Sequence, residues 1–337
     1  MPAAEDCTKH YLITGGAGFI GSHLSEALLR RGDSVTVIDD LSTGRFQNIK
    51  HLVEEYGKGP QSRFRFAIDS ITNETVLDRL ASECHAVIHL AAAVGVRLIL
   101  DEPVRSIETN VLGTEAVLKA ALRYRAKILL ASTSEVYGKG NSVPFREGDD
   151  VVIGSTMRSR WAYSASKMVD EFLALAYWRS KELPVVIFRL FNTVGPRQTG
   201  RYGMVIPRLI EQAIKGKPLT VYGDGSQTRC FLHVADAVAA ILCLADSPEA
   251  IGGVFNVGGL EELSIQSLAE KILAKVGSKE EIIRIPYEEA YQAGFEDMRR
   301  RVPDISRLRQ TVGWEPRRTL DDILTDTIRD VRRRLQG

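Results

Sequence analysis

The chain has 337 residues, of which 44% are hydrophobic and 26% are charged, a composition typical of a globular protein with a buried core. The 44 Lys and Arg residues nearly balance the 43 Asp and Glu residues, which argues against binding to nucleic acid or to a membrane surface. No run reaches the ~18 consecutive apolar residues of a membrane span, and the N-terminus lacks the pattern of a secretion signal. Four scattered cysteines have no metal-ligand spacing, as is typical of free thiols in a reducing compartment. We therefore expect a soluble cytoplasmic protein without a metal site.

Short apolar runs alternate with longer amphipathic stretches through the first half of the chain. This rhythm predicts a parallel, doubly wound α/β sheet with helices on both faces. The predicted strands cover residues 11–14, 34–38, 63–68, 86–90, 127–132 and 185–190. The predicted helices between them cover residues 19–31, 73–81, 103–124 and 162–181.

The rhythm changes after residue 190, where Gly and Pro become frequent. Helical patterns return over residues 205–215, 234–245, 264–276 and 320–335. We expect residues 1–190 to form the sheet domain, with segments around 228–258 returning to it. Residues 191–337 then form a smaller α/β lobe that binds the substrate.

A glycine motif follows the first predicted strand and opens the first predicted helix. Gly15, Gly18 and Gly21 have the spacing G-x-x-G-x-x-G, with Phe19 and Ile20 inside the motif. Glycines let the backbone turn tightly and approach a pyrophosphate, whose charge the helix N-terminus favours. Glycine-rich turns also arise for structural reasons, but the position between strand and helix indicates a dinucleotide site.

Aspartates at the ends of the next two strands suggest which dinucleotide is bound. Asp39 ends the second predicted strand, 18 residues after Gly21, where a carboxylate accepts hydrogen bonds from the adenosine ribose and repels a 2′-phosphate. This favours NAD over NADP, and Asp40 is a candidate for the same role. Asp69 ends the third predicted strand and is a candidate for contact with adenine, although turn capping explains its position nearly as well.

A tyrosine and a lysine stand four residues apart on the helix predicted for residues 162–181. Tyr163 and Lys167 therefore lie on one helix face. A phenol with a pKa near 10 is a weak base at neutral pH, and a neighbouring ammonium favours the phenolate. The pair is common by chance, but together with the upstream glycine motif it indicates acid–base catalysis beside a nicotinamide.

The combined pattern resembles the extended short-chain dehydrogenase/reductase superfamily over nearly the full chain. The glycine motif, His89-Leu90-Ala91-Ala92, Asn110, the segment from Ser132 to Gly138 and Tyr163-x-x-x-Lys167 occur in the family's order. The resemblance implies a Rossmann-type NAD-binding domain, with Tyr163 as proton shuttle, Lys167 as its activator and Thr133 on the reacting hydroxyl. His89 is expected to be a packed histidine rather than a catalyst. Further NAD contacts implied by the resemblance are Thr43, Gly44, Ser70, Leu90, Ala91, Ala92, Asn110, Ser132 and Phe191.

The second half is similar to nucleotide-sugar epimerases and dehydratases within that superfamily. The segment from Arg189 to Gln198 resembles the loop that meets the sugar nucleotide, which implies that Asn192 binds the diphosphate. Arg229 and Arg301 match the family's phosphate-binding arginines, in keeping with the planar fork that a diphosphate favours. The remaining substrate contacts implied by the resemblance are Val94, Arg197, Val205 and Tyr222, the last against the uracil.

The resemblance leaves the reaction that follows oxidation at the sugar C4 open. A 4,6-dehydratase usually carries Asp-Glu where this chain has Ser134-Glu135. A UDP-glucuronate decarboxylase resembles Thr133-Ser134-Glu135, but usually places acidic residues and Gly between the catalytic Tyr and Lys, where this chain has Ser164, Ala165 and Ser166. A sensor without activity typically loses the Tyr or the Lys, and both are present here.

Three segments resemble bacterial 4-epimerases, including UDP-glucuronate 4-epimerases of phosphoglycolipid antibiotic pathways: residues 91–96, 160–163 and 200–203. We therefore expect an NAD-dependent 4-epimerase of a UDP-sugar, with UDP-glucuronate favoured and UDP-glucose as a further substrate. Thr133, Ser134, Glu135 and Arg197 are candidates for the pocket around C6. An ionised Glu135 would repel a substrate carboxylate, so it is protonated, points elsewhere, or faces a neutral hexose. The helices over 103–124 and 162–181 match the family's dimer interface, which implies a homodimer.

Overall fold

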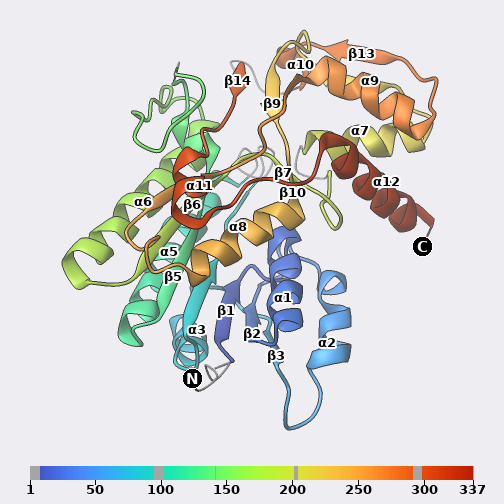
Figure 1. The fold of residues 1–337 in the computed structure, drawn as a ribbon. Helices are drawn as coiled ribbons and strands as arrows, with labels where there is room; N and C mark the ends of the chain where they lie inside the picture. The colour runs from blue at the N-terminus through green and yellow to red at the C-terminus, as the bar shows by residue number, and fades with distance from the viewer. Residues whose placement is uncertain (1–7, 95–101, 141, 201–203, 291–297, 337) are drawn as a thin grey trace.

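The computed structural model describes residues 8–94, 102–140, 142–200, 204–290 and 298–336. Its centre is a seven-stranded sheet in the order β11-β6-β5-β4-β1-β2-β3, with all neighbours parallel (Figure 1). The predicted α/β Rossmann-type fold is confirmed. The strands are β1 (His10–Thr14), β2 (Ser34–Ile38), β3 (Phe64–Ala67), β4 (Ala86–His89), β5 (Lys127–Thr133), β6 (Val185–Leu190) and β11 (Val254–Val257).

Helices bury both faces of this sheet, because successive side chains of a strand point to opposite sides. Ile13 packs into the core on one face and Leu12 into the core on the other. The first face is covered by α1 (Phe19–Arg31), α2 (Lys50–Tyr56), α8 (Val234–Asp246) and α11 (Ser306–Val312). The second face is covered by α3 (Glu74–Ala81), α5 (Pro103–Arg123) and α6 (Trp161–Lys181).

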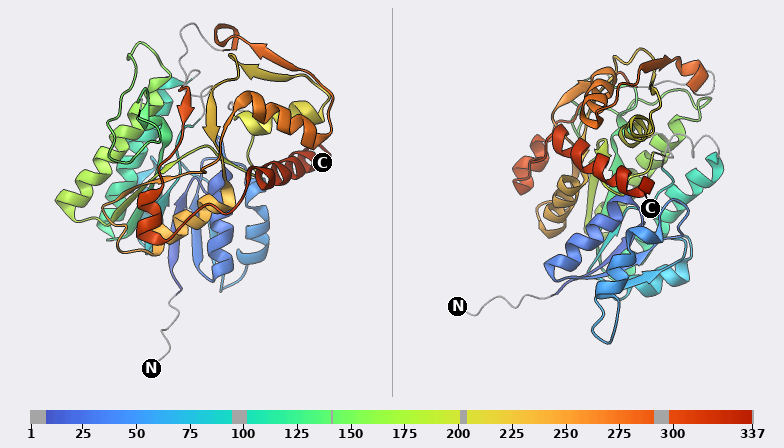
Figure 2. Two further views of the ribbon diagram at one scale, coloured as in Figure 1. Left: turned by 45° about the horizontal axis from the view of Figure 1, so that its top comes forward. Right: turned by 90° about the vertical axis from the view of Figure 1, so that its right-hand side faces the viewer.

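Apart from the cores on the two faces of the sheet, a separate hydrophobic core, called the second core below, lies at one end of the sheet (Figure 2). It is built by α7 (Val205–Ile214), α9 (Ile265–Val276), α12 (Leu320–Gln336) and the parallel pair β8 (Leu219–Tyr222) and β13 (Ile282–Ile285). A small sheet in the order β12-β9-β14 joins Glu262–Ser264, Thr228–Cys230 and Arg300–Arg301. Its register sets Arg301 beside Arg229. The other short elements are η1 (Phe46–Asn48), η2 (Ser134–Tyr137), β7 (Thr193–Val194), β10 (Leu232–His233) and α10 (Tyr287–Ala290).

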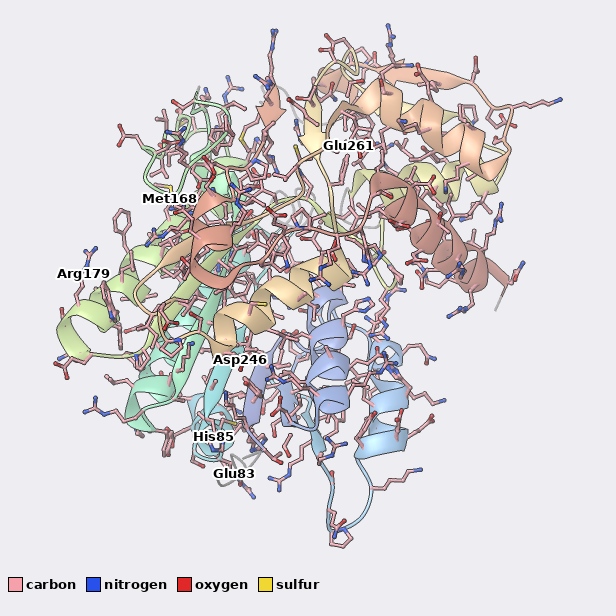
Figure 3. All side chains as sticks on the ribbon, in the orientation of Figure 1. Glu83, His85, Met168, Arg179, Asp246 and Glu261 are labelled. Atoms are coloured by element: carbon pink, nitrogen blue, oxygen red, sulfur yellow. The ribbon has the colours of Figure 1, made fainter. Side chains whose placement is uncertain are left out.

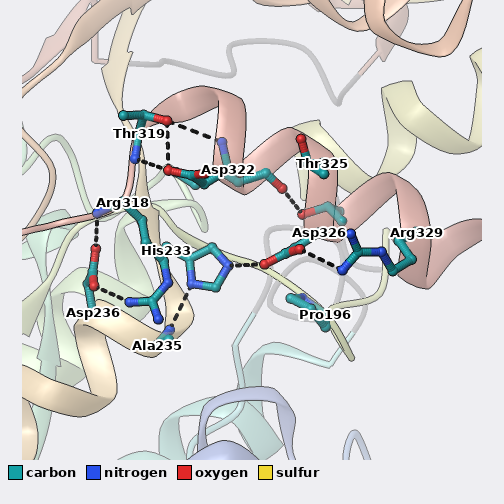
Figure 4. A network of polar contacts seen from close by, with 12 residues as sticks. Pro196, His233, Ala235, Asp236, Arg318, Thr319, Asp322, Thr325, Asp326 and Arg329 are labelled. Atoms are coloured by element: carbon teal, nitrogen blue, oxygen red, sulfur yellow. Dashed lines mark hydrogen bonds and ion pairs between the residues drawn. The ribbon is translucent and has the colours of Figure 1, made fainter.

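A polar network joins α12 to the sheet-covering helix α8 (Figure 4). The buried Asp236 accepts hydrogen bonds from the backbone N–H groups of Arg317 and Arg318, at 3.0 and 2.8 Å, and from the Arg318 guanidinium at 2.5 Å. The His233 ring accepts from the Ala235 N–H at 3.1 Å and lies 3.4 Å from Asp326 of α12. Burial lowers the pKa of His233, so these contacts fix α12 without requiring a charged imidazole.

Ion pairs of ordinary surface type flank the sheet at the amino-terminal end of β1. Asp246, at the end of α8, lies 3.2 Å from the Lys9 ammonium and 2.5 Å from the Arg31 guanidinium (Figure 3). Exposed pairs of this kind contribute little stability. Within the described ranges, no helix combines the length and apolar character needed to cross a bilayer.

The limits of the predicted elements agree with the structure to within one or two residues: the strand predicted over 63–68 covers Phe64–Ala67, and the helix predicted over 103–124 ends at Arg123. Other elements were not predicted, among them α2, α11, β8, β11 and β13. Helix α2 is seven residues long and β11 four, too short for a clear periodic pattern. Part of the epimerase-like segments, residues 95–96 and 201–203, lies outside the described residues.

Candidate active site

A cavity of about 890 Å³ opens at the carboxyl ends of the central strands, between the sheet and the second core. This is within the ordinary size range of small-molecule sites. Strand order reverses between β1 and β4, and such a switch point is where doubly wound sheets bind ligands. The predicted residues that line the cavity are Gly15, Gly18, Phe19, Ile20, Gly21, Asp39, Asp40, Thr43, Asp69, Ser70, Leu90, Ala91, Ala92, Val94, Ser132, Thr133, Ser134, Glu135, Tyr163, Lys167, Asn192, Arg197, Val205, Tyr222, Arg229 and Arg301.

The glycine loop forms a cradle that only glycine permits. Gly15 has a φ of +70°, and a Cβ there would lie 2.8 Å from the Ala91 nitrogen. A Cβ on Gly21 would lie 2.4 Å from the Gly15 carbonyl oxygen. The loop can therefore pass close to a ligand, and α1 begins at the cavity with its N-terminus available for a pyrophosphate. The residues present fit an NAD cofactor.

Asp39 anchors the glycine loop through hydrogen bonds to the backbone. Its Oδ2 accepts from the Ala17 N–H at 2.9 Å and its Oδ1 from the Leu41 N–H at 2.8 Å. Burial raises the pKa of Asp39, and these backbone N–H groups oppose the rise. The ribose contact stays a prediction. Asp69 accepts from the Ser70 N–H and the Asn73 amide, which is the turn-capping role considered as its alternative.

Tyr163 stands in the first turn of α6, facing Thr133 at the end of β5. Burial and the nearby Glu135 raise the pKa of Tyr163 above its usual range, while a hydrogen bond with Thr133 and the charge of Arg301 lower it. The Lys167 ammonium donates to Asp170 Oδ2 at 2.8 Å, and both side chains are buried. Tyr163 therefore sits among groups of both charges.

Glu135 lies in η2 between two arginines from distant parts of the chain. One carboxylate oxygen is 2.6 Å from the Arg301 guanidinium of β14, and the other is 3.4 Å from the guanidinium of Arg160, just before α6. Burial alone would raise the pKa of Glu135, but Arg301 and Arg160 outweigh burial and hold it below its usual value. Glu135 is thus ionised and lines the cavity, with Arg301 and Arg160 compensating its charge.

Arg160 also lines the cavity, although it was not among the predicted site residues. It is 8% exposed, and its guanidinium lies 5.0 Å from the centre of the Trp161 ring. Its position three residues before Tyr163 could have suggested a place near the reaction centre, because residues three apart share a helix face. Apart from this spacing, nothing in the sequence distinguishes Arg160 from an arginine exposed to solvent.

Three predicted NAD contacts, Gly44, Asn110 and Phe191, are absent from the described lining of the cavity and support it from behind. A Cβ on Gly44 would lie 2.6 Å from the Asp39 carboxylate. Asn110 accepts from the Ala93 N–H at 2.8 Å and donates to the Ser166 hydroxyl at 3.0 Å. Phe191 is fully buried against Tyr137.

The side chains predicted for the substrate also have partners within the protein. Arg197 donates to Glu26 of α1 at 2.5 Å, so the structure ties it to that helix and gives no contact to Glu135 or Tyr163. Asn192 donates to the Cys230 carbonyl at 3.0 Å. The Arg208 guanidinium lies 4.3 Å from the centre of the Tyr222 ring, and both residues line the cavity.

Comparison with known proteins identifies the family of the chain. Residues 12–327 match the GDP-mannose 4,6 dehydratase family. The UDP-N-acetyl-alpha-D-glucosaminuronate decarboxylase of Bacillus cytotoxicus is 41% identical, over 95% of this chain and 97% of its own. UDP-glucuronic acid decarboxylase 1 of Xenopus tropicalis is 36% identical, over 99% of this chain and 74% of its own.

Solved structures of epimerases share the fold. The UDP-glucuronic acid 4-epimerase of Bacillus cereus, solved with UDP-glucuronic acid and NAD, has a TM-score of 0.85 and 30% identity, covering 96% of this chain and 99% of that one. The UDP-glucose 4-epimerase of Thermotoga maritima, solved with UDP-glucose, has a TM-score of 0.85 and 28% identity, covering 97% and 99%. The chain belongs to the GDP-mannose 4,6 dehydratase family and is an enzyme of its NAD-dependent nucleotide-sugar epimerase and dehydratase group.

Proposed function

We propose that the protein decarboxylates a UDP-linked hexuronate through a transient 4-keto sugar, rather than catalysing the 4-epimerisation predicted from sequence. The observation that carries the proposal is the cluster of Glu135, Arg301 and Arg160 beside Tyr163. Sequence similarity supports it, since the two decarboxylases above are 41% and 36% identical to the chain and the two epimerases 30% and 28%.

Tyr163 and Thr133 are the groups that handle the proton of the sugar 4-hydroxyl. The Lys167 ammonium on the same helix face and a bound nicotinamide cation would favour the phenolate form of Tyr163. In that form Tyr163 takes this proton, while Thr133 holds the Tyr163 oxygen by a hydrogen bond. Bound NAD supplies the acceptor for the C4 hydride and returns that hydride at the end of the cycle. Gly15, Gly18, Gly21 and Asp39 shape the cradle in which the dinucleotide lies.

A 4-ketone makes a C6 carboxylate part of a β-keto acid. The C5–C6 bond then breaks, carbon dioxide leaves, and the electron pair moves into an enolate on O4. Tyr163, protonated in the previous step, stabilises the negative oxygen by donating a hydrogen bond. A proton from water adds to C5, the ketone is reduced, and Tyr163 returns its proton to O4. The product is the UDP-linked pentose.

The arginine cluster explains how an ionised Glu135 and a substrate carboxylate can share one site. Two guanidinium groups face one carboxylate, so the cluster carries surplus positive charge and attracts a second anion. Glu135 already occupies one carboxylate-binding position on Arg301 and one on Arg160. The two guanidinium groups therefore orient the substrate carboxylate but do not both stabilise it by full hydrogen bonding. A weakly stabilised carboxylate leaves as carbon dioxide more readily.

The 4-epimerase is the second candidate, favoured by the similarity to the Bacillus cereus enzyme with its bound UDP-glucuronic acid. It uses the same proton transfer at Tyr163 but retains the carboxylate and returns the hydride to the other face of the sugar. The two reactions therefore differ in carbon balance.

The deciding experiment incubates purified protein and NAD separately with UDP-glucuronate and UDP-N-acetylglucosaminuronate labelled with ¹³C at C6. Release of labelled carbon dioxide, with a UDP-pentose in the proton NMR spectrum, is expected. A UDP-galacturonate-type product that keeps its label would overturn decarboxylation in favour of epimerisation. A third incubation contains UDP-glucose, and conversion of UDP-glucose alone would instead establish a neutral hexose as substrate. Tyr163→Phe is the control for background hydrolysis.

We also propose that the enzyme is a homodimer. Helices α5 and α6 expose apolar side chains to solvent, namely Val104, Ile107, Leu112, Val169 and Phe172. A face of this kind on two adjacent helices is typical of an oligomer interface. A second copy of the same pair completes a four-helix arrangement.

A further inference from the structure

We propose that Asp170 is a positioning residue that holds the Lys167 ammonium in place and keeps it charged beside Tyr163. This inference rests on the proposed function only in taking Tyr163 as the acid–base group. Asp170 and Lys167 are three residues apart on α6, and their charged atoms are 2.8 Å apart. The Asp170 side chain is fully buried and the Lys167 side chain is 3% exposed, so each charge depends on the other for its stability.

A chain of buried polar side chains connects the end of β1 to Asp170. The Thr14 hydroxyl at the end of β1 lies 2.7 Å from His89 Nδ1, and His89 Nε2 lies 3.0 Å from the Thr114 hydroxyl of α5. Burial lowers the pKa of His89 to about 3, so this ring is neutral and cannot serve as the counter-ion of Asp170. Burial raises the pKa of Asp170, whereas Lys167 and the Thr114 hydroxyl oppose the rise.

Other charges near the pair are already engaged. Glu171, which adjoins Asp170 on α6, is paired with Arg189 of β6 at 2.7 Å. Glu135 of η2 and Arg301 of β14, which both act on Tyr163, are paired with each other. Within the described residues, Asp170 is the anion bonded to the Lys167 ammonium. Loss of its charge therefore leaves a buried cation without a counter-ion, and burial then disfavours the ammonium.

The test measures the protonation of Lys167 directly, in protein free of NAD and substrate. Only the neutral amine reacts with acetic anhydride, so labelling followed by mass spectrometry gives the pH at which Lys167 is half reactive. Exposed Lys58 is the internal reference. In Asp170→Asn, the half-labelling pH of Lys167 should fall by one unit or more, whereas Asp170→Glu should keep it near that of the wild type. The alkaline limb of kcat/KM should move to lower pH in Asp170→Asn by a similar amount.

Equal half-labelling pH values in the wild type and Asp170→Asn would overturn the proposal, even if the variant were less stable or less active. Should Asp170→Asn fail to fold, the comparison is between the wild type and Asp170→Glu, which keeps the charge: Lys167 must keep its half-labelling pH, and a shift of one unit or more refutes the role of the Asp170 charge. Neither measurement depends on which sugar is the substrate, so failure here is distinct from failure of the decarboxylase proposal.

Discussion

Replacing Glu135 by Gln should separate substrate binding from turnover. The change leaves the side chain's size nearly intact but removes the charge that engages Arg301 at 2.6 Å and Arg160 at 3.4 Å. A charge-assisted hydrogen bond contributes about 1.5–3 kcal/mol. Because the Glu135 side chain is partly exposed, we expect its interaction with the arginines to contribute about 2 kcal/mol. In Glu135→Gln the arginines transfer this interaction to the substrate carboxylate. At 1.4 kcal/mol per tenfold change, KM should fall roughly 10- to 30-fold.

The same interaction stabilises the carboxylate before carbon dioxide is lost, so kcat should fall by a comparable factor while kcat/KM changes little. Initial rates of ¹³C-labelled carbon dioxide release, measured against substrate concentration, give both constants. Glu262→Gln is the matched control, because Glu262 pairs with Arg300 at 2.8 Å, directly beside Arg301, and is absent from the described lining of the cavity. A Glu135→Gln enzyme with raised KM, or with wild-type kcat, would refute the reasoning.

Other changes test the remaining parts of the site. Tyr163→Phe should lower turnover about 10³-fold, the usual contribution of general acid–base catalysis; wild-type carbon dioxide release would exclude Tyr163 as the proton carrier. Asp39→Ala leaves the Ala17 and Leu41 N–H groups without their acceptor and should reduce the free energy of unfolding by about 2–4 kcal/mol, with weaker NAD binding by calorimetry; unchanged stability contradicts its role under the loop. Phe172 is 69% exposed, so Phe172→Glu should give a folded monomer by light scattering, and an unchanged dimer mass would place the interface elsewhere. The pKa of Glu135 is held below its unfolded value of about 4.3, so its stabilisation is present above that value and is lost as pH falls through the lower folded pKa. The melting-temperature gap between wild type and Glu135→Gln should therefore be full at pH 7 and shrink as pH falls below about 4.3, and a gap that stays constant throughout acidification would contradict this.

The central sheet was predictable because its strands and helices carry strong local periodicity. The limits predicted for Ser34–Ile38, Val185–Leu190 and Phe19–Arg31 agree with the structure, since each segment has a long apolar pattern with clear ends. Strand β11 was missed because its four residues lie between glycine pairs and become a strand only by pairing with β6. Long-range pairing of this kind leaves little signal in a short segment.

The candidate site likewise combines local motifs, which the sequence predicts, with contacts between distant segments, which it does not. The glycine loop, Tyr163 and Lys167 belong to local motifs, whereas the cluster around Glu135 joins residues 135, 160 and 301. Sequence suggested a conflict between Glu135 and a substrate carboxylate, whereas the two arginines that pair with Glu135 come from separate elements. Arg301 reaches Glu135 because β14 pairs with β9, a contact that depends on the folding of the second core.

The pairing of β11 with β6 limits how the gene can be cut or recombined. A fragment ending at residue 190 loses the outer neighbour of β6 as well as α8 and α11 on one face of the sheet, and an open strand edge promotes aggregation. Chimaeras between relatives therefore need crossover points that keep residues 234–257 and 306–312 with the first 190. The second half is thus a structural part of the sheet domain as well as one wall of the cavity.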